Sequence, residues 1–220
     1  MRRLHSGIDF SDQAVYNRNA NFIKKLGDNY MGREFSSYMI DEENAKIFRF
    51  MQFYIHGDQR CEEVIPHTKV CKNILLIGDP GVGKTMIMQI FSDYSNMLNL
   101  PRKFTCVSIS QLLNSSKLNG NIDKYTYNEK GSNKFEGNPI SLCLNDIGLS
   151  VVNQKDYGTD MNVILEEFLY ARYEIYQNTM LNCHLTSNMS VEDFESNLKP
   201  SLLDRMKSYN VIPVYGKSRR

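Results

Sequence analysis

Eight consecutive residues form the pattern of a phosphate-binding loop: Gly78-Asp79-Pro80-Gly81-Val82-Gly83-Lys84-Thr85. Glycine permits the sharp turns, and the close approach of backbone N–H groups to phosphate oxygens, that such a loop requires. Lys84 is placed to meet the β- and γ-phosphates, and the Thr85 hydroxyl is placed to join the coordination shell of Mg²⁺. The pattern therefore predicts a site for ATP and Mg²⁺, and a glycine turn that binds nothing is the weaker alternative.

The residues on either side of the loop give it the setting that phosphate binding needs. An apolar run at 74–77 indicates a buried strand before the loop. After the loop, apolar residues recur with helical spacing at Ile87, Ile90, Phe91, Tyr94 and Met97. The N-terminus of a helix adds its dipole and its free N–H groups to a phosphate site. We therefore expect all eight loop residues, and Met86 directly after them, to contact the nucleotide.

Two more polar segments follow apolar runs farther along the chain. Asn145 and Asp146 come directly after a run at 142–144, and a carboxylate at the end of a buried strand can hold a metal ion and activate water. Thr186-Ser187-Asn188 ends a second apolar run, where Asn188 fits a residue that contacts the γ-phosphate or the attacking water. Ser and Asn are also common in turns, so a purely structural role for this segment remains an alternative.

The composition is that of an ordinary globular domain. The 220 residues are 41% hydrophobic and 23% charged, with a formal net charge of +1, so the charge of the whole chain gives no indication of nucleic-acid binding. No apolar run is long enough to span a membrane, and the N-terminal residues lack a signal-peptide core. The cysteines are odd in number, and most lie in apolar runs, which favours a reducing compartment. We expect a cytoplasmic protein without a membrane partner.

Short apolar runs alternate with helical stretches from residue 73 onwards, which is typical of a parallel sheet with crossover helices. The expected strands are 73–77, 104–108, 140–144, 181–186 and 210–214, and a long amphipathic helix is expected over 161–175. Before this region, Asp41 has the position of a helix N-cap. Apolar residues recur with helical spacing after it, at Ile47, Phe50, Met51 and Tyr54.

Two segments have weaker patterns. Residues 1–35 are polar and only weakly helical, so we expect an arm that could bind a partner. Residues 114–139 are rich in Asn, Ser, Gly and Lys with isolated aromatic residues, which predicts a long exposed loop. Its lysines could meet phosphates while Tyr125 and Tyr127 stack on the bases of single-stranded DNA. A loop that is merely solvated is the alternative.

Taken in order, these segments resemble the AAA+ ATPases of the DnaC/IstB group, which comprises bacterial and phage helicase loaders and the ATPase subunits of some transposition systems. The resemblance runs from about residue 40 to the last residue, although the phosphate loop alone indicates only a P-loop NTPase. The other segments that carry it are 145–148, 172–174, 185–188, 203–206 and 216–220. It implies a three-layer α/β/α fold with a parallel five-stranded sheet and without a full helical lid domain. The expected domains are a partner-binding arm at 1–40 and an ATP-binding domain at 41–220.

The resemblance also implies roles for single residues. Asn188 would be the sensor of the γ-phosphate, Arg205 would be the arginine finger that reaches a neighbouring subunit's nucleotide, and Arg219 or Arg220 would match the second sensor. For each arginine, a solvated surface charge is the alternative. The implied partners are further copies of this chain in an ATP-dependent homo-oligomer, and a replicative helicase or a transposase.

The chain departs from the group at one position. Two acidic residues are usual where this chain has Asn145 and Asp146. If that register holds, Asn145 offers an amide oxygen to Mg²⁺, which prefers a carboxylate, and hydrolysis would be weak. If Asp146 takes the metal role instead, Ile147 occupies the position of the catalytic acid. In both registers ATP binding is better supported than ATP hydrolysis.

Our leading hypothesis from the sequence is a helicase loader that acts in DNA replication and binds single-stranded DNA. An IstB-like transposition ATPase is the main alternative, although it would need a broader basic surface than a net charge of +1 indicates. A scaffold that binds ATP but hydrolyses it weakly is a further alternative, motivated by Asn145. A nucleotide kinase fits least, because it would need an acceptor pocket and an arginine-rich lid.

Overall fold

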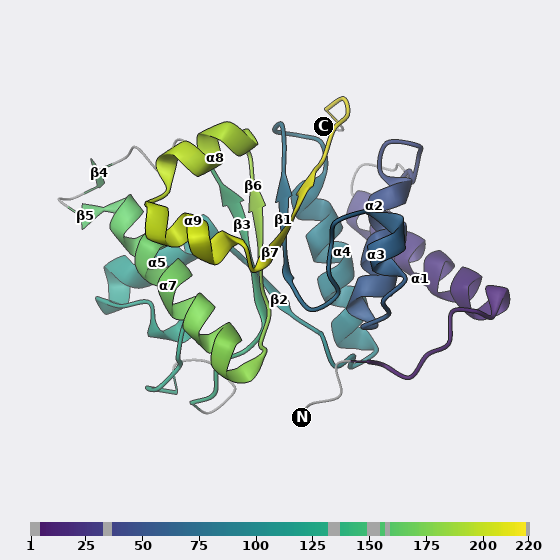
Figure 1. Ribbon diagram of the computed structural model, residues 1–220, viewed down its shortest axis with the longest axis horizontal. Helices are drawn as coiled ribbons and strands as arrows, with labels where there is room; N and C mark the ends of the chain where they lie inside the picture. The colour runs from purple at the N-terminus through teal and green to yellow at the C-terminus, as the bar shows by residue number, and fades with distance from the viewer. Residues whose placement is uncertain (1–4, 33–36, 132–136, 149–154, 157–158, 219–220) are drawn as a thin grey trace.

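The computed structural model describes residues 5–32, 37–131, 137–148, 155–156 and 159–218, and a parallel sheet lies at its centre (Figure 1). The strands of this sheet are β1 (Asn73–Ile77), β2 (Thr105–Ser108), β3 (Leu142–Ile147), β6 (Cys183–Ser187) and β7 (Tyr209–Pro213). They stand in the order β2-β3-β6-β1-β7, and every neighbouring pair is parallel. The five strands expected from the sequence are confirmed, with ends that differ by a few residues.

Helices cover both faces of the sheet (Figure 1). One layer contains α1 (Gln13–Met31), α2 (Ala45–Ile55), α3 (Cys61–Val64) and α4 (Lys84–Met97). The other contains α5 (Ile109–Asn119), α7 (Met161–Thr179), α8 (Val191–Asn197) and α9 (Pro200–Met206). A separate cluster of buried apolar side chains fills the space on each side, including Phe91 in the first and Phe168 in the second. The predicted three-layer α/β/α arrangement is therefore confirmed, and no helix follows β7 within residues 214–218.

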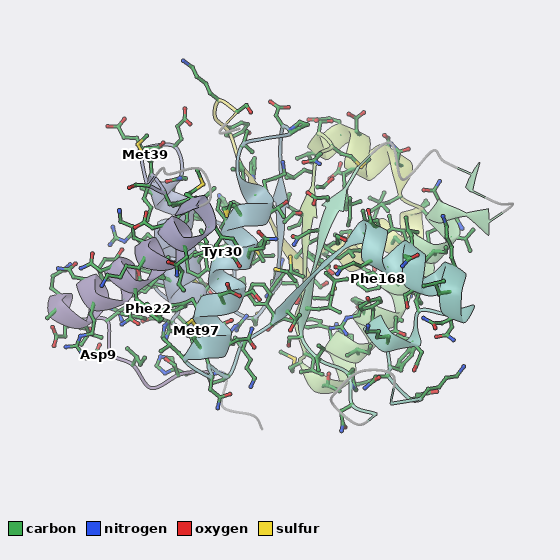
Figure 2. All side chains as sticks on the ribbon, turned by 180° about the vertical axis from the view of Figure 1, so that it is seen from behind. Asp9, Phe22, Tyr30, Met39, Met97 and Phe168 are labelled. Carbon is green, nitrogen blue, oxygen red and sulfur yellow. The ribbon has the colours of Figure 1, made fainter. Side chains whose placement is uncertain are left out.

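The N-terminal segment is more ordered than its sequence pattern predicted. Residues 13–31 form the 19-residue helix α1, and the Asp12 carboxylate caps it by accepting two backbone N–H groups of the first turn. The helix packs along α4: the Phe22 ring lies 5.8 Å from that of Tyr94, and the Tyr30 hydroxyl donates to the Asp93 carboxylate at 2.6 Å (Figure 2). The prediction of weak helicity was wrong, because the few apolar residues of this helix, among them Ile23 and Leu26, form one face that is buried in the core.

The start of α2 also differs from the prediction. Asp41 is not its N-cap, because the helix begins at Ala45 with Asn44 in the capping position. The Asp41 carboxylate instead accepts the backbone N–H groups of Glu43 and Asn44, at 3.1 and 3.3 Å. An aspartate that bonds the backbone two residues ahead forms a local turn. The same side chain therefore builds the turn before the helix.

The segments between the strands carry more structure than expected. The helix α5 extends to Asn119, and its start has a capping box between Ser108 and Gln111. A 3₁₀ turn follows at Asp123–Tyr125, and Asn128 is fully buried. The prediction of one exposed loop over 114–139 is wrong for the described residues of that range. Before α7, a two-stranded antiparallel hairpin of β4 (Lys155–Asp156) and β5 (Thr159–Asp160) had no signal in the sequence.

The burial of two histidines, His56 and His184, makes the free energy of unfolding depend on pH. Burial lowers the pKa of His56 to about 4, and burial with the nearby charges of Arg102 and Arg172 lowers the pKa of His184 to about 3. Both rings are therefore neutral in the folded chain, whereas an unfolded histidine has a pKa of about 6.5. Because the folded-state pKa values are depressed, the stabilisation is complete above about pH 6.5 and is lost as the pH falls towards 4 for His56 and towards 3 for His184.

We expect the free energy of unfolding to fall by about 1.4 kcal/mol per histidine for each pH unit inside this window. Urea unfolding between about pH 5 and about pH 7 measures the slope. His184→Asn keeps an acceptor for the Ile74 N–H group, which bonds the ring nitrogen at 3.2 Å, and should remove about half of the slope. An unchanged slope in this variant would contradict the assignment.

Candidate functional site

The predicted phosphate loop connects the end of β1 to the start of α4, at one end of the sheet (Figure 1). Gly78 has φ +148°, and a Cβ atom there would lie 2.2 Å from the carbonyl oxygen of Val214, so no larger residue fits. Gly83 has φ +95° and forms the N-cap of α4. The loop therefore leads directly into a helix N-terminus, which is the arrangement that presents backbone N–H groups to an anion.

Lys84 is folded back over this loop. Its side chain is buried, and its ammonium donates to the carbonyl oxygens of Gly78 and Asp79, each at 2.7 Å. These two contacts hold the positive charge at the centre of the loop. A phosphate group in the loop would therefore meet a cation that is already in place.

The acidic side chain of the site comes from β3. The register between β3 and β6 shifts between Leu144 and Ile147, which is a bulge, and Asp146 has the left-handed value φ +67°. The Asp146 carboxylate accepts a hydrogen bond from the Thr85 hydroxyl at 2.8 Å. A hydroxyl and a carboxylate so paired are two oxygen ligands of the kind that Mg²⁺ takes in phosphate sites.

Asn145 has a different position from that of Asp146. It is 3% exposed, and its amide oxygen accepts hydrogen bonds from the Thr186 hydroxyl at 3.2 Å and from the Cys143 thiol at 3.3 Å. These two partners are in β3 and β6, and Asn145 does not line the cavity beside the loop. Of the two residues for which the sequence left the register open, Asp146 is the one that meets Thr85.

A cavity of about 460 Å³ opens beside these groups. Its lining residues form two groups: a polar group from the phosphate loop and the ends of β3 and β6, here called the polar wall, and a largely apolar group from α4, the end of α1 and the segment before α2, here called the apolar wall. The lining residues are Gly81, Gly83, Lys84, Thr85, Asp146 and Asn188 on the first wall and Met31, Ser37, Tyr38, Met39, Met86 and Gln89 on the second. A ligand with an anionic end and a flat apolar end matches these two walls.

Sequence reasoning found the polar wall and missed most of the apolar one. Met86 was predicted, but Met31, Tyr38 and Met39 come from a segment well before the loop and carry no motif. Asn188 also lines the cavity, and its backbone N–H donates to the Ile147 carbonyl at 3.0 Å. The structure therefore brings Asn188 and Asp146 together with the phosphate loop.

Arg205 does not line the cavity. Arg205 is stacked between two rings of α7, with its guanidinium carbon 4.6 Å from the Tyr170 centroid and 5.2 Å from that of Tyr173. One of its nitrogens donates to the Ser201 carbonyl at 2.8 Å. Arg219 and Arg220 lie outside the described residues. The chain just before them approaches the phosphate loop, because a Cβ atom on Gly81 would lie 2.5 Å from the Ser218 hydroxyl.

Arg172, which contributed to the resemblance without a stated role, is a structural residue. It is 1% exposed, and its guanidinium donates to the carbonyl oxygens of Ile140 and Asn182 at 2.8 and 3.1 Å. These carbonyls lie just before β3 and β6, so Arg172 ties α7 to the starts of both strands.

The two tyrosines of the segment 114–139 that were expected to stack on DNA bases have contacts within the chain. The Tyr127 hydroxyl donates to Glu174, and Tyr125 packs against the second apolar cluster.

No protein-family model and no curated protein matches the sequence. Among solved structures, domain III of the Thermotoga maritima replication initiation protein DnaA superposes with a TM-score of 0.54 at 14% identity, over 81% of this chain and 65% of that one. The chain has an AAA+-like fold. DnaI superposes with a TM-score of 0.51 at 19% identity, over 81% of this chain and 88% of that one.

The DnaC helicase loader also superposes, with a TM-score of 0.50 at 13% identity, over 81% of this chain and 93% of that one. These superpositions show a similar overall fold at low sequence identity. The chain spans just under two thirds of the DnaA domain and 48% of a DnaA structure from Aquifex aeolicus. At these sequence identities the similarity establishes the fold, while activity and partners have to be argued from the site.

Proposed function

We propose that this chain binds ATP with Mg²⁺ in the cavity beside the phosphate loop. The observation that carries the proposal is that Lys84, Thr85 and Asp146 line one wall of that cavity. Lys84 would hold the β- and γ-phosphates, while Thr85 and Asp146 would hold the metal ion, which when bound neutralises charge on the phosphate oxygens. Asn188 would contact the γ-phosphate or the attacking water. Arg219 or Arg220 would reach the phosphates from the C-terminal segment.

Hydrolysis is proposed to be slow. Asp146 is the one carboxylate among the described residues that line the cavity. If Asp146, paired with Thr85, holds the metal ion, the role of catalytic base would fall to the next residue, Ile147. The Ile147 side chain is a buried hydrocarbon and cannot accept a proton. ATP binding therefore has stronger support than ATP hydrolysis. If hydrolysis is negligible, the chain would act as a scaffold whose assembly depends on ATP binding.

The apolar wall is proposed to hold the adenine base, which gives a test with a matched control. Met39 lines the cavity and is 67% exposed, whereas Met97 is 64% exposed at the far end of α4 (Figure 2). We expect Met39→Ala to weaken ATP binding by roughly 3- to 10-fold, the effect of losing about 1 kcal/mol of apolar contact.

Fluorescent-ATP titration measures this loss, and competition with inorganic tripolyphosphate isolates the part of the affinity that is due to the base. Met97→Ala should leave ATP affinity unchanged, and both variants should bind tripolyphosphate like the wild type. Equal ATP affinity in Met39→Ala and Met97→Ala would contradict the proposal that the adenine base packs against the apolar wall.

For the biological role, we propose a cytoplasmic helicase loader that acts in DNA replication, binds single-stranded DNA and forms an ATP-dependent homo-oligomer. The support is the fold shared with the DnaC helicase loader and DnaI, together with the proposed nucleotide site. The exposed surface of residues 1–40 would contact the helicase, and residues 41–220 would bind ATP together with Met31, Tyr38 and Met39, which line the same cavity. The alternative partner is a transposase. Purification of the tagged chain from its native host with and without ATP, followed by identification of the retained protein, distinguishes a helicase from a transposase.

A further inference from the structure

Asp146 has a backbone conformation that needs support from its surroundings. Its φ of +67° lies in the left-handed region, which residues with a side chain rarely adopt. It also lies in the bulge of β3, where regular pairing with β6 is interrupted between Leu144 and Ile147. The carboxylate nevertheless points to Thr85. Some contact must therefore fix this residue where the strand ladder does not.

That contact comes from Thr186 on β6. The Asp146 backbone N–H donates to the Thr186 hydroxyl oxygen at 2.9 Å, and the same hydroxyl donates to the Asn145 amide oxygen at 3.2 Å. Thr186 is fully buried. Because the hydroxyl proton is directed at Asn145, the hydroxyl lone pairs are left to accept the Asp146 N–H. The two bonds form one chain from Asn145 through Thr186 to the Asp146 backbone.

We propose that Thr186 and Asn145 are positioning residues that hold the Asp146 carboxylate against Thr85 and so set the metal affinity of the site. This inference rests on the proposed ATP and Mg²⁺ site. It gives Asn145 a different role from the metal contact that the family resemblance implies. An amide suits this role, because a second carboxylate at a nearly buried position beside Asp146 would add an unpaired negative charge.

Variants of Thr186 separate positioning from packing. Thr186→Val keeps the shape and removes the hydroxyl, whereas Thr186→Ser keeps the hydroxyl. We expect Thr186→Val to raise the Mg²⁺ concentration needed for half-maximal ATP binding by at least about tenfold, the effect of losing one hydrogen bond of about 1.4 kcal/mol. Affinity for ATP without metal should stay within about twofold. Thr186→Ser should behave like the wild type, and Thr186→Ala substitutes for Thr186→Val if that protein does not fold.

Asn145→Asp tests the two roles of Asn145 against each other. A metal-contacting residue would gain a charge and lower the Mg²⁺ requirement of ATP binding. A positioning residue gains nothing, so we expect an unchanged or higher Mg²⁺ requirement and a lower unfolding temperature. A lower Mg²⁺ requirement in Asn145→Asp would overturn the proposal.

A readout that needs neither nucleotide nor metal tests the chain of hydrogen bonds directly. Amide hydrogen exchange of Asp146, followed by NMR, should be at least about tenfold faster in Thr186→Val than in the wild type or Thr186→Ser. The amide of Leu144, in the regular part of β3, serves as the control and should not change. If the wild type does not bind ATP, the proposed function fails, while the exchange result still decides whether Thr186 holds Asp146. Unchanged exchange in Thr186→Val, or faster exchange with an unchanged Mg²⁺ requirement, overturns the inference.

Discussion

Replacing Lys84 with alanine is expected to lower ATP affinity by at least about 100-fold while leaving the fold intact. Hydrogen bonds to charged groups are worth about 1.5 to 3 kcal/mol each, and Lys84 would make two or more to the phosphates. The substitution should lower the stability of the free protein by less than it lowers ATP affinity. The ammonium contacts the carbonyls of Gly78 and Asp79, which are half-buried and exposed residues, so water can replace these contacts. Fluorescent-ATP titration measures the loss, and circular dichroism checks the fold.

Lys103 provides the matched control for this prediction. It is an exposed lysine in the connection between α4 and β2, and its ammonium bonds only the Asn99 side chain among the described residues. Lys103→Ala should bind ATP like the wild type, which shows that the loss in Lys84→Ala is not a general effect of removing positive charge. If Lys84→Ala and Lys103→Ala bind ATP equally well, the phosphate loop is not a nucleotide site.

The parts of the site that could be predicted from the sequence rest on short local patterns. The glycines of the phosphate loop, Lys84 and Thr85 are read from eight adjacent residues, and the apolar runs before them and before Asp146 indicate buried strands. In a parallel sheet, the carboxyl ends of the strands meet at one edge. That rule alone brings the ends of β1, β3 and β6 together, so the neighbourhood of Thr85, Asp146 and Asn188 follows from topology.

The remaining parts depend on tertiary packing that no local pattern encodes. The apolar wall uses Tyr38 and Met39, which lie near α4 because α1 and α2 pack against that helix. The register of Asn145 and Asp146 was undecided in the sequence, because a one-residue bulge changes which side chain faces Thr85. The helix α1 was underestimated because its few apolar residues stabilise it only once they pack against α4 and the core.

Arg205→Ala is expected to lower the already slow ATPase rate of assembled protein to below detection, because an arginine finger supplied by a neighbouring subunit contributes about 10³- to 10⁵-fold. The guanidinium is held on its own subunit by the rings of Tyr170 and Tyr173, and it is half-buried. This stack fixes the direction of the side chain before any neighbour arrives. Because Arg205 does not line the subunit's own cavity, its loss should leave ATP affinity unchanged.

Mixing two inactive variants tests whether Arg205 acts between subunits. Arg205→Ala subunits can bind ATP but lack the finger, and Lys84→Ala subunits cannot bind ATP but still carry the finger. At a mixed interface the second would supply Arg205 to the nucleotide of the first, so activity should return as the ratio approaches equality. Arg49→Ala, which removes an arginine near the Phe53 ring on α2, is the control for loss of a cation–π contact and should retain full activity. Absence of recovery at every ratio, with both variants folded and assembled, would mean that Arg205 serves only the packing of α7 against α9.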